Sequence, residues 1–199
     1  MNNLLMGSAR NNTMTLHHLQ TPLTLPDILG LRAGDLVYLD GTVFTARDRA
    51  HERILQRSKT PFDPAGAVIY HCGPVMKEVG RSWQAIAAGP TTSARMDSQT
   101  GELLKRFGVR AIIGKGGMSV TDAMLNRCVY LAAIGGCAVV AADRIVVRDV
   151  RWLDLGMAEA VWVLDVHDFG PLIVGIDAHG RNLFDEVKSR SEKRLSAMF

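Results

Sequence analysis

The sequence has no long apolar run and no large excess of charge, and each absence excludes a class of protein. No stretch of its 199 residues approaches the roughly 18 consecutive apolar residues of a membrane-spanning helix. Its 23 Lys and Arg residues against 20 Asp and Glu give a formal charge of +3, too small and too scattered for a nucleic-acid-binding surface. We therefore expect neither a membrane nor a nucleic acid as partner.

The sequence also lacks paired cysteines. Cys72, Cys128 and Cys137 are odd in number, and no two of them have the CxxC spacing. A disulfide framework is therefore not expected, and a reducing cytoplasm is the simpler setting. Buried free thiols are the usual reading. A cluster held by these three cysteines stays an open alternative, although no recurring cysteine spacing supports it.

No low-complexity linker or internal repeat divides the chain, so we predict one domain over residues 15–199. Its length and its 47% hydrophobic and 22% charged residues suit a single globular core. Residues 1–14 are polar and aperiodic and lack the apolar core of a secretory signal. We expect them to form a disordered extension, with Met14 as an alternative translation start.

Hydrophobic periodicity and turn residues predict an α/β fold. The expected strands cover 36–39, 42–45, 67–70, 83–88, 109–113, 129–134, 160–166 and 172–176. The expected helices cover 46–56 with Thr45 as N-cap, 99–107, 121–128, and the charged tail from residue 186. Asp40-Gly41 predicts a tight turn that makes the first two strands a hairpin. Predicted strands alternate with predicted helices between residues 83 and 145, which favours a partly parallel sheet. The hairpin-like strands near the two ends of the chain favour a second, antiparallel layer.

Three predicted strands end in glycine and open into polar turns or helices, at 89–93, 114–117 and 135–137. Ligands of α/β proteins bind at the carboxyl ends of strands, where glycine lets the backbone come close. Free N–H groups at a helix start attract anions. The pattern predicts an anion site.

Three cations strengthen this prediction. Lys115 lies inside a glycine loop, Arg95 follows Thr91 by four residues, and Arg47 opens a predicted helix. Arginine grips a carboxylate with two hydrogen bonds, so the set suits a small dicarboxylate. The other reading is that the arginines are solvated surface charges and the glycine turns are structural.

Other ligand motifs fail on spacing. Five residues, not the four of a phosphate-binding loop, separate Gly108 from Gly114, and Ser119 stands where a dinucleotide fingerprint needs glycine. His51-Glu52 is followed by Leu55 where a zinc-protease helix has its second histidine. Asp48 and His51, one helical turn apart, could pair simply to order their helix.

Several ordered segments together resemble one family. They are 41–51 with Arg47-Asp48 and His51, the stretch GPTTSARMD at 89–97, GKGGM at 114–118, GGCA at 135–138, DLGM at 154–157 and FGPLIV at 169–174. The chain resembles, over roughly residues 20–185, the β subunits of L(+)-tartrate dehydratases and the C-terminal halves of class I fumarases.

The resemblance implies a swivelling β/β/α three-layer fold, with a parallel central sheet and a second antiparallel sheet. It implies an α subunit that holds a [4Fe–4S] cluster whose open iron acts on the departing hydroxyl, with no metal held by this chain. It also implies an α2β2 assembly and a dicarboxylate substrate.

By motif, the resemblance implies that Arg47, Arg95 and Lys115 bind the carboxylates and that Thr91 takes the proton, its pKa lowered by Lys115 or Arg95. Asp48, His51 and Thr92 would support them.

Differences within the family bear on the substrate. Fumarases commonly have Lys-Gly-Asn or Lys-Gly-x-Arg in the lysine loop and Asp-Phe-Pro near the end. This chain has Gly116-Gly117-Met118 after Lys115, Phe169-Gly170-Pro171, and the Gly-Gly-Cys137 element. The resemblance therefore favours dehydration of L-tartrate to oxaloacetate, with fumarate hydration as the alternative. A non-catalytic module that binds small organic anions is the alternative from another class.

Overall fold

The computed structural model describes residues 14–198. The strands are β1 (Leu16–Gln20), β2 (Leu36–Thr45), β3 (Val68–Tyr70), β4 (Val75–Val79), β5 (Ser82–Ala87), β6 (Ala111–Gly114), β7 (Val129–Ala132), β8 (Ile145–Arg151) and β9 (Val161–Ile176). The helices are α1 (Leu25–Gly30), α2 (Asp48–Arg57), α3 (Asp97–Arg106), α4 (Thr121–Met124), α5 (Ala138–Ala142) and α6 (Leu183–Ser196). Two short 3-10 turns, η1 (Ser93–Met96) and η2 (Leu153–Leu155), complete the described part.

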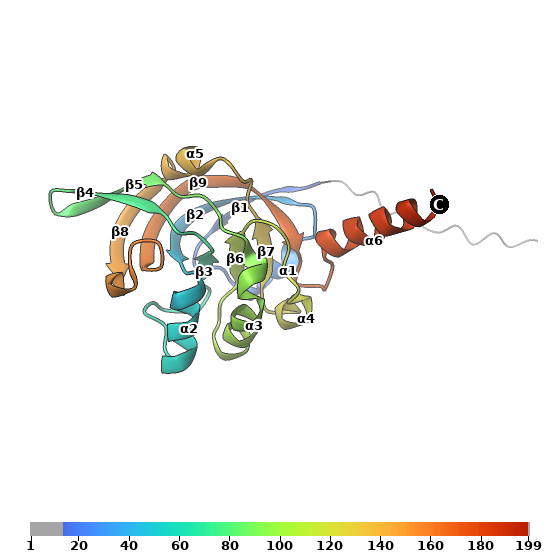
Figure 1. Ribbon diagram of the computed structural model, residues 1–199, viewed down its shortest axis with the longest axis horizontal. Coiled ribbons are helices and arrows are strands. Elements are labelled where there is room, and N and C mark those ends of the chain that lie inside the picture. Colours follow the sequence, from blue (N-terminus) through green and yellow to red (C-terminus); the bar gives the residue numbers. More distant parts are fainter. Residues whose placement is uncertain (1–13, 199) are drawn as a thin grey trace, which may run out of the picture.

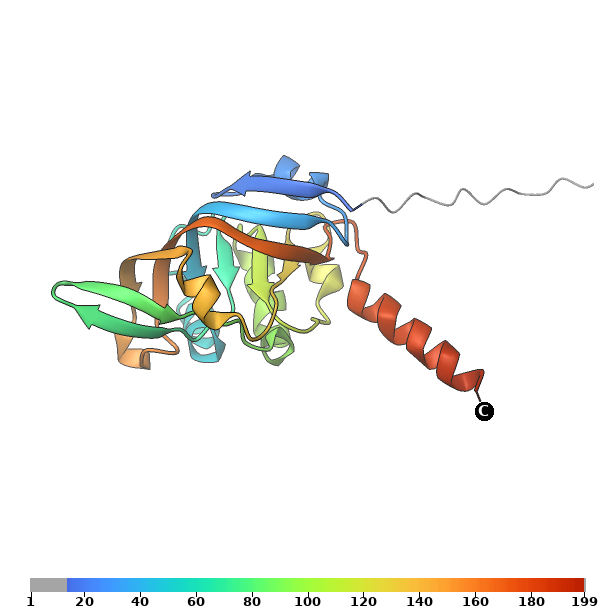
Figure 2. The same ribbon diagram turned by 90° about the horizontal axis from the view of Figure 1, so that it is seen from above.

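Seven strands form one mixed sheet in the order β1-β2-β3-β6-β7-β9-β8 (Figure 1). The first five run parallel to one another, whereas β9 runs antiparallel to β7 and β8. Strand β9 has 16 residues and also pairs with β2, from Leu36–Ile173 to Phe44–Val163. The sheet therefore curls until β9 lies beside β2 (Figure 2).

Successive residues of the central strands point into two separate cores, as the period of two in a strand requires. In β3, Val68 and Tyr70 belong to the core inside the curl, while Ile69 belongs to the core beneath the helices. That second core receives Ile54 from α2 and Leu103 from α3. Helices α2, α3 and α4 lie together on this face of the sheet (Figure 1). Burial on both faces explains the continuous apolar runs of these short strands.

A separate two-stranded antiparallel sheet, β4–β5, extends from the body as an arm (Figures 1 and 2). Close to the turn that joins the two strands, Trp83 packs edge-on against the buried Trp162, with ring centroids 5.1 Å apart. The α/β class with a central sheet and a second antiparallel sheet is thereby confirmed, but the central sheet is mixed and only partly parallel. The antiparallel sheet comes from the middle of the chain, not from the strands near its ends.

The predicted hairpin at 36–45 is wrong, because β2 runs through it as one strand. Gly41 has φ of +99° and lies at a register shift between β2 and β9, so its left-handed conformation makes a bulge. A Cβ there would lie 2.6 Å from the side chains of Gln20 and Thr21. Thr45 is not the cap of α2 either, because its hydroxyl is buried and bonded to Ala160 and Trp162. Arg47 occupies the N-cap.

Other helices and strands also differ in their bounds from the prediction. The helix expected over 121–128 ends at Met124, before Asn126 with φ of +57°. The strands expected at 160–166 and 172–176 are one strand, β9. A Cβ at Gly170 would lie 2.7 Å from the Val37 carbonyl, so glycine lets β9 cross β2 closely. Strands β1, β4 and β8 and helices α1 and α5 were not predicted.

The tail is helical as predicted, and α6 projects from the body (Figure 2). Of the predicted extension at 1–14, residues 1–13 lie outside the described residues. No helix within 14–198 is both long and apolar enough to cross a membrane.

Candidate functional site

Two predicted site residues, and one histidine that was not predicted, follow the carboxyl ends of three adjacent parallel strands. Arg47 comes two residues after β2, His71 directly after β3, and Lys115 directly after β6. Strands β2, β3 and β6 are neighbours and parallel, so their ends meet at one edge of the sheet.

The segment around Thr91 is inserted at this edge between β3 and β6. The Thr91 N–H donates to the His71 carbonyl (2.7 Å), and the Lys115 N–H donates to the Thr91 carbonyl (3.2 Å). The Ser93 N–H then donates to the Lys115 carbonyl (3.1 Å). Glycine is required at Gly114 because a Cβ there would lie 1.9 Å from the Ser93 hydroxyl oxygen. The backbone thus fixes Thr91 and Lys115 side by side.

A network of ion pairs joins the two arginines. Arg95 Nη2 donates to Asp48 Oδ2 at 2.9 Å, and Arg47 Nη2 lies 3.7 Å from the same oxygen. Arg47 Nε also lies 3.4 Å from Glu159, without hydrogen-bond geometry. A second Glu159 oxygen accepts the Arg49 N–H at the start of α2. Glu159 thereby ties Arg47 to the helix that carries it.

Burial differs between the two arginines. The Arg47 side chain is 22% exposed, while Arg95 is half exposed. Gly73 makes room for Arg47, since a Cβ there would lie 2.4 Å from its Nη1. The Asp48–Arg95 pair is solvated and so worth at most about 1 kcal/mol. An incoming carboxylate can therefore replace Asp48 on Arg95 at little cost.

Lys115 is exposed, and none of the acidic groups within residues 14–198 pairs with it. Gly116 after it has φ of +72°, which turns the chain sharply. The Cδ of Lys115 lies 3.8 Å from the position that a Cβ on Gly135 would take, so the lysine side chain runs beside the 135–137 loop. The ammonium group is thus available to an anion.

The two threonines differ in exposure. Thr91 is partly buried between His71 and Lys115, and its hydroxyl has no hydrogen bond within the described residues. Thr92 is exposed and forms a parallel bridge with Lys115. It stands at the N-cap of η1 but makes no capping bond. A free hydroxyl on Thr91 is compatible with contact to a ligand.

Two histidines lie buried behind these residues. His51 Nδ1 is 3.0 Å from the Arg47 carbonyl, and His71 Nδ1 is 2.9 Å from the Ser93 hydroxyl, which accepts from Tyr130 at 3.2 Å. Burial lowers the pKa of His51, and burial together with the nearby His51 lowers the pKa of His71 well below its usual value. Both imidazoles are therefore neutral at pH 7.

No role was predicted for His71, Ser93, Tyr130 or Glu159. The first two follow predicted strand ends, which was the only available signal. Tyr130 lies inside β7 and Glu159 in a loop, so nothing in the sequence points to either.

The cysteines are not gathered at this edge. No group of three or more Cys, His, Asp and Glu side chains able to hold a metal occurs among residues 14–198. Cys72 and Cys128 are buried and Cys137 is exposed. Burial raises the pKa of Cys72 to about 12 and that of Cys128 further still, so both are thiols rather than metal-binding thiolates. The residues described here do not fit a cluster.

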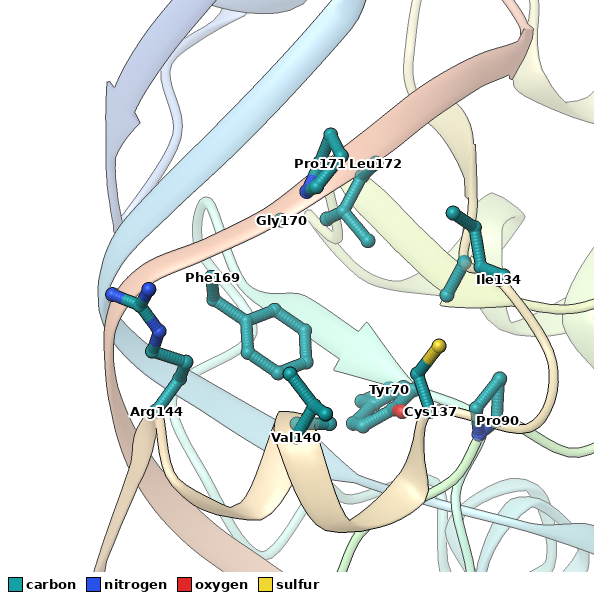
Figure 3. Close-up of a pocket in the computed structure, with 12 residues that line it drawn as sticks. Tyr70, Pro90, Ile134, Cys137, Val140, Arg144, Phe169, Gly170, Pro171 and Leu172 are labelled. Carbon is teal, nitrogen blue, oxygen red and sulfur yellow. The ribbon is translucent and has the colours of Figure 1, made fainter.

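A cavity of about 190 Å³ is lined in part by Pro90, which precedes Thr91, and by Cys137 (Figure 3). Its walls include Tyr70, Phe169 and Leu172 and are mainly apolar. Its one cation, Arg144, lies at the opposite end from Cys137 and pairs with Asp168 at 3.1 Å (Figure 3). A dicarboxylate fits the cations of Arg47, Arg95 and Lys115 better than this cavity.

Comparison with known proteins places the chain among relatives of similar length. The model of the fumarase C-terminus family matches residues 5–187. The L(+)-tartrate dehydratase subunit beta of Escherichia coli K12 is 41% identical over 181 residues, which are 88% of this chain and 90% of that protein. A protein of Methanocaldococcus jannaschii, provisionally named L(+)-tartrate dehydratase subunit beta, is 45% identical over 88% of this chain and 95% of its own length.

A longer relative matches over part of its length. A protein of Geobacillus stearothermophilus, provisionally named fumarate hydratase class I, is 42% identical over 89% of this chain but only 35% of its own length. The resemblance found in the motifs thus extends over nearly the whole sequence, and the chain belongs to the fumarase C-terminus family.

Proposed function

We propose that this chain is the β subunit of an iron–sulfur hydro-lyase that dehydrates a 2-hydroxy-dicarboxylate. The observation that carries the proposal is the meeting of Arg47, Arg95, Lys115 and Thr91 at one sheet edge in a member of this family. Three cations there can balance two carboxylates and favour the charge that develops as a proton leaves carbon.

In this proposal the cations hold the substrate. Arg95 exchanges Asp48 for one carboxylate, Arg47 stays anchored by Glu159 and contacts the same group, and Lys115 binds the other carboxylate. Asp48 orients both arginines before substrate arrives. Thr92 stands at the solvent side of the lysine loop and supports it.

Thr91 is the residue we assign to proton transfer. Dehydration removes a proton from one carbon and hydroxide from its neighbour, leaving a double bond between them. A neutral hydroxyl is a weak base, so Thr91 needs a lowered pKa. The Lys115 N–H is hydrogen-bonded to the Thr91 carbonyl, so the two residues lie on adjacent segments. In this proposal the long Lys115 side chain brings its positive charge to the developing alkoxide.

We assign the [4Fe–4S] cluster to a partner α subunit, because the cysteines described here do not fit one. The names of the relatives contain the word subunit, which supports an α partner. An α2β2 assembly in the cytoplasm, and the swivelling β/β/α three-layer arrangement of the fold, belong to the same proposal.

L-tartrate is the substrate we favour. Two relatives bear the name of L(+)-tartrate dehydratase subunit beta, and the lysine loop reads Gly116-Gly117-Met118. Fumarate hydration is the second candidate, supported by the 42% identical relative named for that activity. The site supports both, since each substrate presents two carboxylates.

An anaerobic assay of this chain co-expressed with its α partner tests the proposal. Dehydration of L-tartrate and of L-malate is followed side by side. Preference for tartrate supports the favoured substrate, and preference for malate makes the chain a fumarase subunit. If no complex forms and the chain alone binds dicarboxylates without turnover, the non-catalytic anion-binding module replaces the enzyme.

A further inference from the structure

Two fully buried imidazoles link the segments that carry the site's cations. His51 lies on α2 and His71 directly follows β3; their ring centroids are 5.1 Å apart, with the ring planes at 69°. His51 is bonded to the carbonyl of Arg47 itself. His71 is bonded to Ser93, two residues from Thr91 and two from Arg95.

The hydrogen-bond partners fix which nitrogen of His51 carries the proton. A carbonyl oxygen can only accept, so Nδ1 of His51 must donate to the Arg47 carbonyl. In a neutral imidazole the other nitrogen is then bare. His51 Nε2 is therefore an acceptor, and it is buried without a partner among the described residues.

The opposite holds for His71. The buried Ser93 hydroxyl accepts from Tyr130, and the acceptor left for its own hydrogen within the described part is His71 Nδ1. Buried hydroxyls are rarely left without an acceptor. His71 Nε2 thus carries the proton, and this donor too is buried without a partner in residues 14–198.

One buried donor and one buried acceptor therefore lie on adjacent rings. Two imidazoles joined by an N–H···N bond of about 2.9 Å have their centroids ~5 Å apart, close to the observed spacing. Leaving both atoms unpaired would cost the protein the desolvation of each. A small ring rotation, or one enclosed water between them, satisfies both and leaves the tautomers unchanged.

We propose that His71 donates through Nε2 to Nε2 of His51, and that this bond locks the Arg47 turn to the Thr91–Arg95 segment. The two histidines are positioning residues: they touch no substrate but hold the carboxylate-binding arginines in register. The resulting chain of hydrogen bonds runs from Tyr130 through Ser93, His71 and His51 to the Arg47 carbonyl.

The tautomers can be tested without any activity. The full-length chain, labelled with 15N-histidine, is examined by long-range 1H–15N correlation, which separates protonated from bare ring nitrogens. We expect two neutral histidines of opposite tautomers at pH 7, assigned with His51→Gln and His71→Gln. Equal tautomers, or a charged ring, would overturn the pair.

The consequence for the site, which rests on the proposed function, is tested with a matched pair of variants. His71→Gln can place an amide N–H where Nε2 was, whereas His71→Asn keeps a polar group only near Nδ1. In the complex with the α subunit, we expect His71→Asn to raise KM for the dicarboxylate about tenfold, the loss of one neutral hydrogen bond. His71→Gln should recover most of that loss, with kcat changed much less in both.

Thermal unfolding of both variants separates positioning from folding. If His71 were merely structural, the changes in KM would follow the loss in Tm. Equal KM values for the two variants would refute the proposed hydrogen bond between His71 and His51. If the wild-type complex turns over no hydroxy-diacid, the proposed function fails, and the spectra of the full-length chain alone decide the pair.

Discussion

Arg95 and Asp48 lie 47 residues apart in sequence and are joined by a 2.9 Å hydrogen bond at the mouth of the site. Asp48 holds Arg95 towards Arg47 while no substrate is bound. Because the pair is exposed, we expect it to stabilise the fold little, and we propose that it orients Arg95.

Asp48→Asn tests this orientation. We expect KM for the dicarboxylate to rise about threefold to fivefold, the effect of an exposed ion pair worth up to ~1 kcal/mol, with kcat nearly unchanged. Asp154→Asn is the matched control, because it breaks the Arg53–Asp154 pair elsewhere on α2. Steady-state kinetics of the complex measure both, and equal KM values in the two variants would contradict the orienting role.

Lys115→Ala removes the one site cation that has no acidic partner in the described residues. We expect kcat/KM to fall roughly 10–100-fold, since a charge-assisted hydrogen bond is worth about 1.5–3 kcal/mol. The Tm should not change because the side chain is exposed. Lys105→Ala, on the exposed face of α3, is the control. Unchanged kcat/KM for Lys115→Ala would exclude Lys115 from the site.

Thr91→Val separates proton transfer from binding. The variant keeps the shape of the side chain and loses the hydroxyl, so kcat should fall roughly 10²–10⁴-fold, as for loss of a proton-transfer group. Binding of the dicarboxylate, measured by calorimetry on the complex, should persist. Thr92→Val serves as the control for the adjacent position. Normal turnover by Thr91→Val would remove Thr91 as the base.

Gly114→Ala tests how the strand end accommodates Ser93. A Cβ at this position would lie 1.9 Å from the Ser93 oxygen, so we expect a loss of about 1–3 kcal/mol in the free energy of unfolding. Urea unfolding measures it. Gly30→Ala is the control, because nothing lies within 4 Å of its added methyl group. Adding Ser93→Gly to Gly114→Ala should restore part of the loss.

The thiols should differ in reactivity. Raised pKa values leave Cys72 and Cys128 protonated at pH 8, so a thiol reagent should label only the exposed Cys137 quickly. Labelling of Cys72 should increase only as the pH rises towards about 12, where its thiolate forms. Cys137→Ser should abolish the fast phase seen by mass spectrometry. Rapid labelling of a second thiol in that variant would contradict the burial described here.

Local signals explain which parts of the fold were predictable. Helix 99–107 has apolar residues at helical spacing and strand 67–70 is a continuous apolar run; both were observed within two residues of the predicted bounds. The Asp40-Gly41 pair is typical of a hairpin turn, yet in the structure Gly41 forms a β-bulge within β2. Whether Asp-Gly turns the chain or bends a strand depends on β9, which pairs with β2 from more than a hundred residues away.

The candidate site, too, was predictable from the sequence only in part. The residue types and spacing of Arg47, Thr91, Arg95 and Lys115 were visible in the sequence, because each follows a strand end or lies in a glycine loop. Their possible roles remain predictions. Asp48 as the link between two arginines, and Glu159 behind Arg47, depend on contacts between distant segments.

The sequence by itself determined the α/β class, the family and the cations available at the strand ends, because these follow from local pattern and motif. Only the tertiary structure decided that β9 closes the sheet onto β2 and that His51 meets His71 beneath the site. Such contacts depend on which strands pair and on which side chains are shut away from water together, and no local stretch of sequence contains that information.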